Sequence, residues 1–408
     1  MVEVTFSTDY QNEYGEDFTD YPNIYREENF YIAKGFKENF ELVFNLDGDL
    51  IFFSNENKSK QVFISERGQI NGLVDIRSLY NGQINEVLSN GNFKSEMAPD
   101  HLNEVKKYIN TGMEILLEAY PDHIIINNYF SGITKDKQSL FKKMTDNIPL
   151  ILPADAIERK YNLAKIIVNR GCGKKNMCKG CKTGGDKRYQ KSKIEIESQI
   201  DYYIENYPNT LHTYSGLLIG GEDPLLLETD LIVHSLNYAA EKLNFSAFEE
   251  QHNSSITTMS ENPGFAYTFG GLKTLSNMDV KELRRCANEG LKTVNAGLES
   301  ALKSIMETKF PKFTIAEAER GIANCKEAGL DLSLNVILGF GEDDEKHLNE
   351  TLEFLRHTNF NGKIYLSRYI NDNGTYQTEL SDFLDQVMYF INEYEHSQLI
   401  SFFPIVYL

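Results

Sequence analysis

The feature that most constrains the fold is an alternation of short apolar segments with amphipathic segments, which runs from Lys165 to Tyr369. The apolar segments are typical of buried strands and the amphipathic ones of helices. Strands are predicted over 165–170, 214–221, 254–260, 293–299, 332–340 and 363–369, and helices over 194–207, 230–244, 279–290, 313–329 and 345–358. Such an order predicts an α/β fold with a parallel sheet, closed or partly closed as a barrel, whose chemistry lies at the carboxyl ends of the strands.

The helix over 313–329 carries its own start and stop signals. Thr314 with Glu317 three residues later is typical of a capping box at a helix start. Gly329 is a typical helix stop, because glycine adopts the left-handed conformation without strain.

Residues 1–155 have a different pattern and predict an additional N-terminal α+β domain. The segment "FELVFNLDGDLIFFSN" alternates around Asp47-Gly48, a pair that favours a tight hairpin turn. A further strand at 60–68, a helix at 100–120, a strand at 123–130 and a helix near 139–144 follow. We therefore divide the chain into an N-terminal domain at 1–155, an α/β domain at 156–370 and a C-terminal segment at 371–408.

Three of the five cysteines lie within ten residues, in "GCGKKNMCKGCKTGG". Cys172, Cys178 and Cys181 follow the first strand of the alternation, where a parallel fold places its chemistry. An odd cysteine count with one dense cluster is a poor disulfide framework and favours a metal site in a reducing compartment. Structural zinc needs a fourth ligand, and no histidine is near in sequence. An iron–sulfur cluster on three cysteines leaves one iron open to another ligand. Free thiols on a flexible loop are the third alternative.

Charge is unevenly distributed along the chain. The net charge is −19, which argues against a nucleic-acid partner because an acidic surface repels phosphates. Residues 159–193 reverse this balance, with twelve Lys or Arg against one acidic residue. This basic island is either a solvated loop, a docking surface for an acidic electron carrier, or compensation for an anionic metal–thiolate cluster.

Neither a membrane span nor a secretory leader is predicted. No run of eighteen apolar residues occurs, and the N-terminus is acidic and aromatic. We expect a cytoplasmic protein.

Together with the cysteine loop, motifs at the later strand ends resemble the radical S-adenosylmethionine (radical SAM) superfamily over about residues 160–370. The cysteine spacing, x5 and then x2, differs from the usual x3 and x2. "LLIGGEDPLL" resembles the segment that receives the amino group of the bound methionine, with Asp223 inserted before the proline. The residues that match are Gly220, Gly221, Glu222 and Pro224. A carboxylate and open carbonyls are suitable acceptors for an ammonium group.

The resemblance continues along the following strands. "VNAGLES" resembles the strand end whose polar side chain touches the ribose, a role that falls to Glu299 first and Asn295 second. "NVILGFGEDDE" resembles the adenine-side strand end, with Ile337 near adenine and Gly339 where the backbone approaches. "KIYLSRY" supplies backbone groups to adenine, and Lys309 falls where a basic residue meets the methionyl carboxylate.

Each of these motifs also has a purely structural interpretation, such as a turn, a helix cap or a core position. Their joint occurrence on successive strand ends favours the resemblance. Cys286 and Cys325 lie on predicted helices beside apolar residues and are interpreted as small core residues. The alternative is that one of them donates a hydrogen atom to a substrate radical.

The resemblance implies a partial (β/α)6 TIM-like barrel that binds a [4Fe–4S] cluster and S-adenosylmethionine. An electron from the cluster would split S-adenosylmethionine to a 5′-deoxyadenosyl radical, which abstracts hydrogen from substrate. Residues 1–155 and the C-terminal segment would cover the barrel mouth and choose a peptide or small-metabolite substrate. An acidic electron donor of the flavodoxin or ferredoxin type would dock on the basic island. A structural-zinc binding protein and a catalytically silent cluster-binding scaffold remain alternatives.

Overall fold

The computed structural model describes two units, which we treat one at a time. By contacts the chain divides into unit 1, Met1–Asn147 with Tyr202–Thr213 and Pro404–Leu408, and unit 2, Ile148–Asp201 with Tyr214–Phe403. The described residues are 23–27, 30–35, 40–47, 50–55, 61–64, 70–72, 99–121, 123, 126–127, 137, 140, 144, 163–170, 189–214, 216–243, 264–341, 343–369, 371, 376–394 and 400–402.

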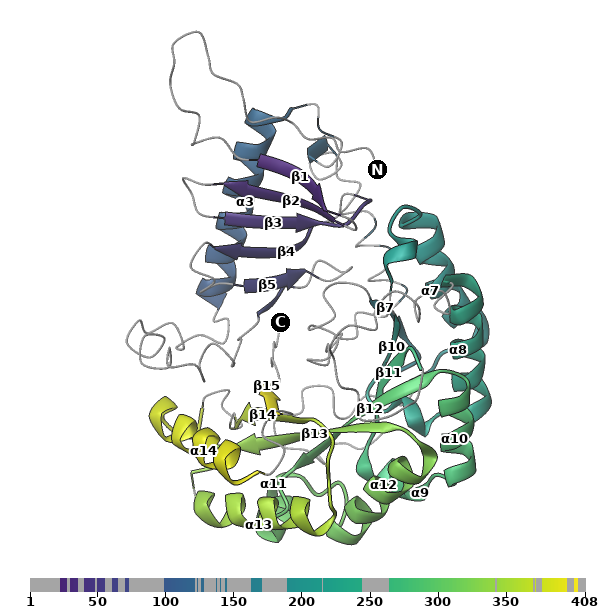
Figure 1. Cartoon of the computed structure of the whole chain (residues 1–408), viewed down its shortest axis with the longest axis vertical. Helices are drawn as coiled ribbons and strands as arrows, with labels where there is room; N and C mark the ends of the chain where they lie inside the picture. Colours follow the sequence, from purple (N-terminus) through teal and green to yellow (C-terminus); the bar gives the residue numbers. More distant parts are fainter. Residues whose placement is uncertain are drawn as a thin grey trace. The chain divides into compact units, whose positions relative to one another are not determined.

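Unit 1 contains a six-stranded antiparallel sheet in which each strand pairs with the next along the chain (Figure 1). The strands are β1 (Asn23–Glu27), β2 (Phe30–Gly35), β3 (Phe40–Phe44), β4 (Leu50–Asn55), β5 (Gln61–Ile64) and β6 (Ile70–Gly72). The predicted hairpin is confirmed, since Phe44 pairs with Leu50 across the turn that contains Asp47.

The helix predicted over 100–120 is α3 (Pro99–Ala119), which contacts β3. It buries Ile109, Met113 and Leu116, whose spacing of four and three residues places them on one helical face. The strand predicted over 123–130 is wrong at Ile126 and Asn127, which are helical.

Unit 2 is built on a seven-stranded sheet in which every strand is parallel to its neighbour. In sheet order the strands are β15 (Ile400–Phe402), β14 (Ile364–Arg368), β13 (Asp331–Leu338), β12 (Leu291–Glu299), β11 (Ala266–Phe269), β10 (Gly216–Gly220) and β7 (Leu163–Ile167). The sheet curves strongly, as a barrel that is only partly closed (Figure 1). The predicted partial α/β barrel is therefore confirmed.

Two strands of this sheet differ from the prediction. The third strand is β11, whereas we predicted a strand over 254–260, which lies outside the described residues. A seventh strand, β15, comes from the C-terminal segment and pairs with β14. Its three residues are too short to produce a recognisable alternation.

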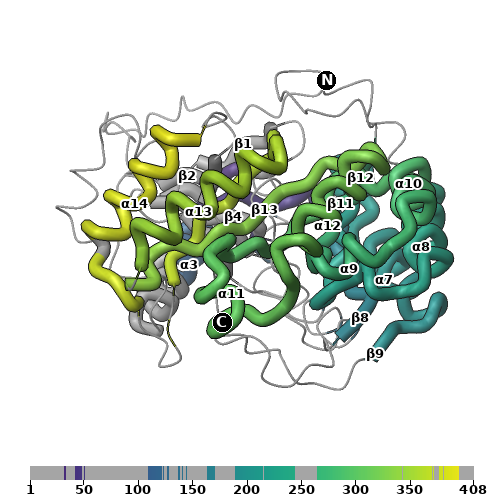
Figure 2. The backbone as a smooth tube through the Cα atoms, turned by 90° about the horizontal axis from the view of Figure 1, so that it is seen from below, coloured from purple at the N-terminus to yellow at the C-terminus, as the bar shows by residue number. Residues whose placement is uncertain are grey.

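Helices cover the convex face of the sheet (Figure 1). They are α7 (Lys193–Asn206), α8 (Thr229–Leu243), α9 (Leu272–Asn277), α10 (Val280–Asn288), α11 (Lys303–Lys309), α12 (Ile315–Ala328), α13 (Asp344–His357) and α14 (Leu380–Glu393), with the 3-10 turn η4 (Pro224–Leu226). The 3-10 turn η3 (Leu211–Thr213) belongs to unit 1. Helices α13 and α14 lie side by side in Figure 2. The Tyr389 hydroxyl on α14 donates a hydrogen bond to Asn349 Oδ1 on α13. Among the described residues, no helix combines the length and apolarity that crossing a membrane requires.

The capping signals of α12 are formed as predicted. The Thr314 side chain accepts the Glu317 backbone N–H, and the Glu317 carboxylate accepts the Thr314 N–H. Gly329 ends the helix in the left-handed conformation, with φ of 78°.

The two faces of the seven-stranded sheet differ in polarity. Residues on the helix-covered face are apolar and buried, among them Leu217, Ile219, Val294, Ala296, Leu334, Val336 and Leu366. The alternate residues make up the opposite face, which we call the inner face, and include Lys165, Tyr267, Thr293, Asn295, Ser333, Asn335, Tyr365 and Ser367. The inner face therefore carries polar side chains among apolar ones such as Leu218, Phe269 and Ile337, whereas an ordinary core face is apolar throughout.

Candidate functional site

The carboxyl ends of the parallel strands meet at one edge of the sheet, and the predicted site residues follow this edge. Glu222 and Pro224 come after β10, Glu299 ends β12, and Gly339 comes after β13. The structure therefore brings the strand-end motifs of the sequence into one row.

The residues that flank the cysteine segment lie at the same edge. β8 (Asn169–Arg170) and β9 (Tyr189–Gln190) pair antiparallel directly after β7, so they hold the two ends of segment 171–188 side by side. Cys172, Cys178 and Cys181 belong to this segment and lie outside the described residues. Their role as metal ligands stays a prediction.

The turn after β10 is shaped by a glycine that packs against Asn169. Gly221 has φ of 146°, and a Cβ there would overlap the Oδ1 atom of Asn169. Asn169 Nδ2 donates to the Asp223 carbonyl oxygen at 2.8 Å, which ties the start of the cysteine segment to this turn. Asp223, the inserted residue, accepts a hydrogen bond from the Thr274 hydroxyl at 2.6 Å through its carboxylate.

The same asparagine leaves an acceptor unused. Asn169 is 2% exposed, and its Oδ1 atom has no hydrogen-bond partner among the described residues. A buried acceptor normally has a donor. Beside Gly221 and Glu222 it suits an ammonium group, so the described residues fit the amino end of the methionine that the resemblance implies.

Glu299 belongs to a hydrogen-bonded network that crosses three strands. It ends β12 in the left-handed conformation, with φ of 62°, and is buried. Its Oε1 accepts from Lys312 Nζ at 3.2 Å, and its Oε2 accepts from Asn335 Nδ2 at 3.0 Å. Asn335 Oδ1 in turn accepts from the Ser367 hydroxyl at 2.7 Å. The network fixes the orientation of the carboxylate at the sheet edge.

The turn after β13 is held by side chains from α13 and α14. Gly339 has φ of 80°, and its N–H donates to Gln386 Oε1 at 2.9 Å. Asp344 accepts the N–H groups of Phe340 and Gly341, and also Gln386 Nε2 at 2.9 Å. The backbone at Gly339 is therefore rigid, as an approach to a flat ligand requires.

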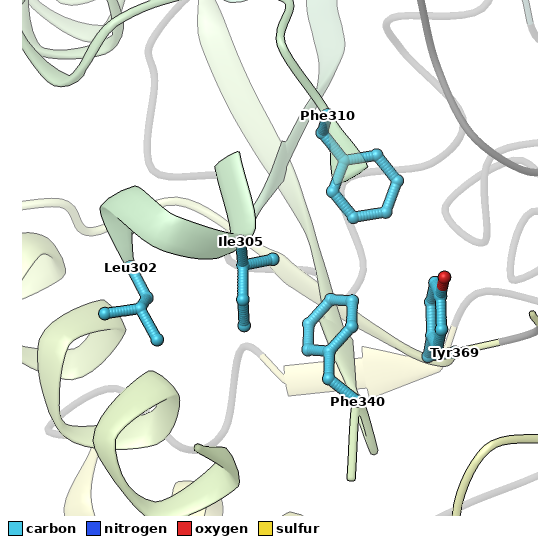
Figure 3. Close-up of a cluster of buried hydrophobic side chains, with 5 residues drawn as sticks. All are labelled: Leu302, Ile305, Phe310, Phe340 and Tyr369. Carbon is cyan, nitrogen blue, oxygen red and sulfur yellow. The ribbon is translucent and has the colours of Figure 1, made fainter. Parts of the chain in front are cut away.

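Lys309 lies against a hydrophobic cluster. The cluster contains Leu302, Ile305, Phe310, Phe340 and Tyr369 (Figure 3). Ile337 packs against it. Lys309 Nζ lies 4.6 Å from the centre of the Tyr369 ring and donates to its hydroxyl at 3.4 Å. These contacts place the cation at the edge where the predicted site residues gather.

His347 supports the strand end at Ile337 from the helix-covered face. Its Nε2 is 2.8 Å from the Ile337 carbonyl oxygen, which only accepts, so Nε2 carries the proton. Nδ1 then accepts from the Ser300 hydroxyl at 2.9 Å. Burial lowers the pKa of His347 to about 4, from an ordinary value of 6.5. The ring is therefore neutral at pH 7.

This lowered pKa predicts a loss of stability in acid. Below pH 6.5 His347 is protonated in the unfolded chain, whereas in the folded chain it stays neutral down to about pH 4. We expect the free energy of unfolding to fall by up to about 3 kcal/mol across that window. Chemical denaturation at pH 7 and pH 4.5 measures it. In His347→Gln this part of the pH dependence should vanish, and an unchanged pH dependence would contradict the assignment.

Cys286 and Cys325 are completely buried, on α10 and α12, which pack together. Burial raises the pKa of each thiol to about 12. This environment suits the core interpretation, while hydrogen donation by either thiol stays an untested alternative. Within the described residues, no group of three or more His, Cys, Asp or Glu side chains is arranged to hold a metal ion.

A family model matches the segment that contains the cysteines and three of the four strand-end motifs. Residues 166–355 match the model of the radical SAM superfamily. This chain contains a radical SAM domain. Enzymes with such a domain bind a [4Fe–4S] cluster and S-adenosylmethionine.

Solved structures similar to the chain are also radical SAM proteins. Methylornithine synthase is 13% identical, with a TM-score of 0.41 over 64% of this chain and 73% of the other. Coproporphyrinogen III oxidase of Escherichia coli is 13% identical, with a TM-score of 0.39 over 59% and 55%. The methyltransferase TsrM of Kitasatospora setae is 14% identical, with a TM-score of 0.35 over 54% of this chain. The match spans 38% of the methyltransferase chain. No curated protein matches significantly.

Four residues that contact predicted site residues were missed by sequence reasoning. Asn169, Lys312 and Gln386 match no motif, and Asn335 opens the segment "NVILGFGEDDE" but was given no role there. A polar residue directly after an apolar strand was the available signal for Asn169. Gln386 lies 47 residues from Gly339, and no local pattern links them.

Proposed function

We propose that the chain is a radical SAM enzyme that reductively cleaves S-adenosylmethionine and abstracts hydrogen from a peptide or small-metabolite substrate. The observation that supports this most is the family match, because residues 166–355 include the three cysteines and three of the four strand-end motifs. In this proposal Cys172, Cys178 and Cys181 hold a [4Fe–4S] cluster. When bound, the cluster supplies the electron that cleaves S-adenosylmethionine to methionine and a 5′-deoxyadenosyl radical.

The remaining residues bind and orient S-adenosylmethionine. Its amino group would be accepted by the turn at Gly220, Gly221, Glu222 and Pro224, with Asn169 Oδ1 as an additional acceptor. Lys309 is the candidate partner of the methionyl carboxylate.

The nucleoside end would lie along the later strand ends. Glu299 is the candidate for the ribose hydroxyls, since its carboxylate is oriented by Lys312 and Asn335. Ile337 offers an apolar surface for adenine, and the turn at Gly339 brings rigid backbone close to it.

The chain needs a reductant and a substrate. An acidic flavodoxin or ferredoxin is the electron donor that complements the basic island at 159–193. The acidic balance of the whole chain argues for a peptide or small molecule over a nucleic acid.

Anaerobic reconstitution of the full chain with iron and sulfide tests this proposal. We expect a brown protein that forms 5′-deoxyadenosine when S-adenosylmethionine and dithionite are added, measured by chromatography with mass detection. A colourless protein holding zinc would support the structural-zinc alternative. An iron-loaded protein that forms no 5′-deoxyadenosine would support the silent scaffold.

A further inference from the structure

Asn295 is a buried amide on the inner face of the sheet. Its side chain is 4% exposed, and neither Oδ1 nor Nδ2 has a hydrogen-bond partner among the described residues. Buried side-chain amides are normally paired, and leaving both atoms unpaired is costly. In Asn335, on the next strand, both amide atoms are paired within the protein. The buried amide of Asn295 is therefore a candidate for binding a ligand.

Asn295 does not lie at the carboxyl end of its strand, where the other predicted site residues gather. It lies inside β12, four residues before Glu299, and faces the same side as Thr293 and Gly297. Across the sheet it is level with Phe269 on β11 and Ser333 on β13. Asn295 was the second candidate for the ribose after Glu299, but all the other nucleoside and methionyl candidates lie at or after strand ends. Asn295 is therefore deeper along the inner face than any of them. A group bound there extends past S-adenosylmethionine toward the interior of the partial barrel.

The chemistry of the unpaired atoms defines what they would bind. A primary amide presents an N–H donor and a carbonyl acceptor side by side in one plane. Its complement is a planar group with an acceptor and a donor on the same side, as a primary carboxamide has. The N–H and C=O of a single trans peptide bond point in opposite directions and do not form such a pair. Phe269, which is level with Asn295 on β11, adds an aromatic residue to the same face. Thr293 and Ser333 add hydroxyl groups to that face.

We propose that Asn295 is a specificity-determining residue that recognises an amide group of the substrate. The proposal deepens the function given above and rests on it, since it takes the inner face as the substrate side. The edge of adenine offers a similar donor and acceptor pair. The depth of Asn295 within β12 favours the substrate, and the experiment separates the two.

The experiment uses the full chain and acetamide as the probe, with acetone as an analogue of the same shape that lacks the N–H donor. Dissociation constants come from ligand-observed NMR titration. We expect acetamide to bind the wild type at least about tenfold more tightly than acetone, as one lost hydrogen bond of ordinary strength predicts. Asn295→Leu, and Asn295→Ala if the leucine variant folds poorly, should lose this preference.

A matched control is Asn324→Leu. Asn324 on α12 donates through Nδ2 to the carbonyl oxygens of Leu275 and Met278, so its amide is paired within the protein. Without ligand, Asn295→Leu should melt above the wild type by about 2 °C, because it removes unpaired buried atoms. Asn324→Leu should melt below the wild type and keep the probe preference.

Three results would overturn the proposal. One is equal binding of the two probes by the wild type, and another is a melting temperature of Asn295→Leu that falls as in the control. The third is a loss of S-adenosylhomocysteine affinity in Asn295→Leu, which would assign the residue to the nucleoside. None of these measurements uses radical chemistry. If the wild type prefers the amide probe but forms no 5′-deoxyadenosine, the proposed function is contradicted and the amide-binding site is still supported.

Discussion

Replacing Cys178 with alanine is expected to abolish both iron binding and the formation of 5′-deoxyadenosine. Three thiolates within ten residues are the fewest that hold a cubic iron–sulfur cluster with one iron left open, so no cysteine of the segment is spare. Loss of an outer-shell partner costs a metal site about 10–100-fold in affinity or activity, and loss of a direct ligand should exceed that. Iron per chain, the absorbance near 400 nm and the yield of 5′-deoxyadenosine measure the effect.

The control for this variant is Cys325→Ala. Cys325 is completely buried on α12 and is not part of the cysteine segment. Its replacement should lower stability by about 1 kcal/mol through the small cavity and leave the iron content unchanged. If Cys178→Ala retained the iron of the wild type, the cysteine segment would not be the cluster site. If Cys325→Ala lost iron as well, the effect of Cys178→Ala would not be specific.

Replacing Gly221 with alanine is expected to weaken S-adenosylmethionine binding by about 10- to 100-fold, because a displaced turn loses a hydrogen bond to the charged amino group, which is worth about 1.5–3 kcal/mol. At φ of 146° only glycine is unstrained, and the added Cβ would overlap the Asn169 amide. Asn169 cannot turn away without breaking its bond to the Asp223 carbonyl oxygen. The turn must then shift, and stability should fall by about 2–4 kcal/mol. Anaerobic calorimetry and chemical denaturation measure the two effects.

Gly329→Ala separates backbone strain from damage to the site. Gly329 also has positive φ, at 78°, but a Cβ there would meet nothing within 4 Å. This variant should lose only about 1 kcal/mol of stability and bind S-adenosylmethionine like the wild type. Equal binding by Gly221→Ala and the wild type would show that the turn after β10 does not hold the ligand.

Much of the α/β domain follows from local sequence. The boundaries of α7, α8, α10, α12 and α13 agree with the predicted helices to within two residues, because hydrophobic period and capping are local properties. The hairpin at Asp47 is local in the same sense. The prediction failed where the signal was short or ambiguous: β11 has four residues, and Ile126 lies in an apolar run that is compatible with either a helix or a strand.

The sequence by itself determined that strands and helices alternate and that three cysteines and several strand-end motifs follow one another in order. It also placed those motifs at one sheet edge, because parallel strands end on the same side. Only the tertiary structure decided which side chains meet there. The joining of Lys312, Glu299, Asn335 and Ser367, the contact of Asn169 with Gly221, and the unpaired amide of Asn295 all depend on strand register and on residues distant in the chain. Periodicity in the sequence indicates which face of the sheet a residue occupies. Whether its side chain finds a hydrogen-bond partner depends on the assembled sheet.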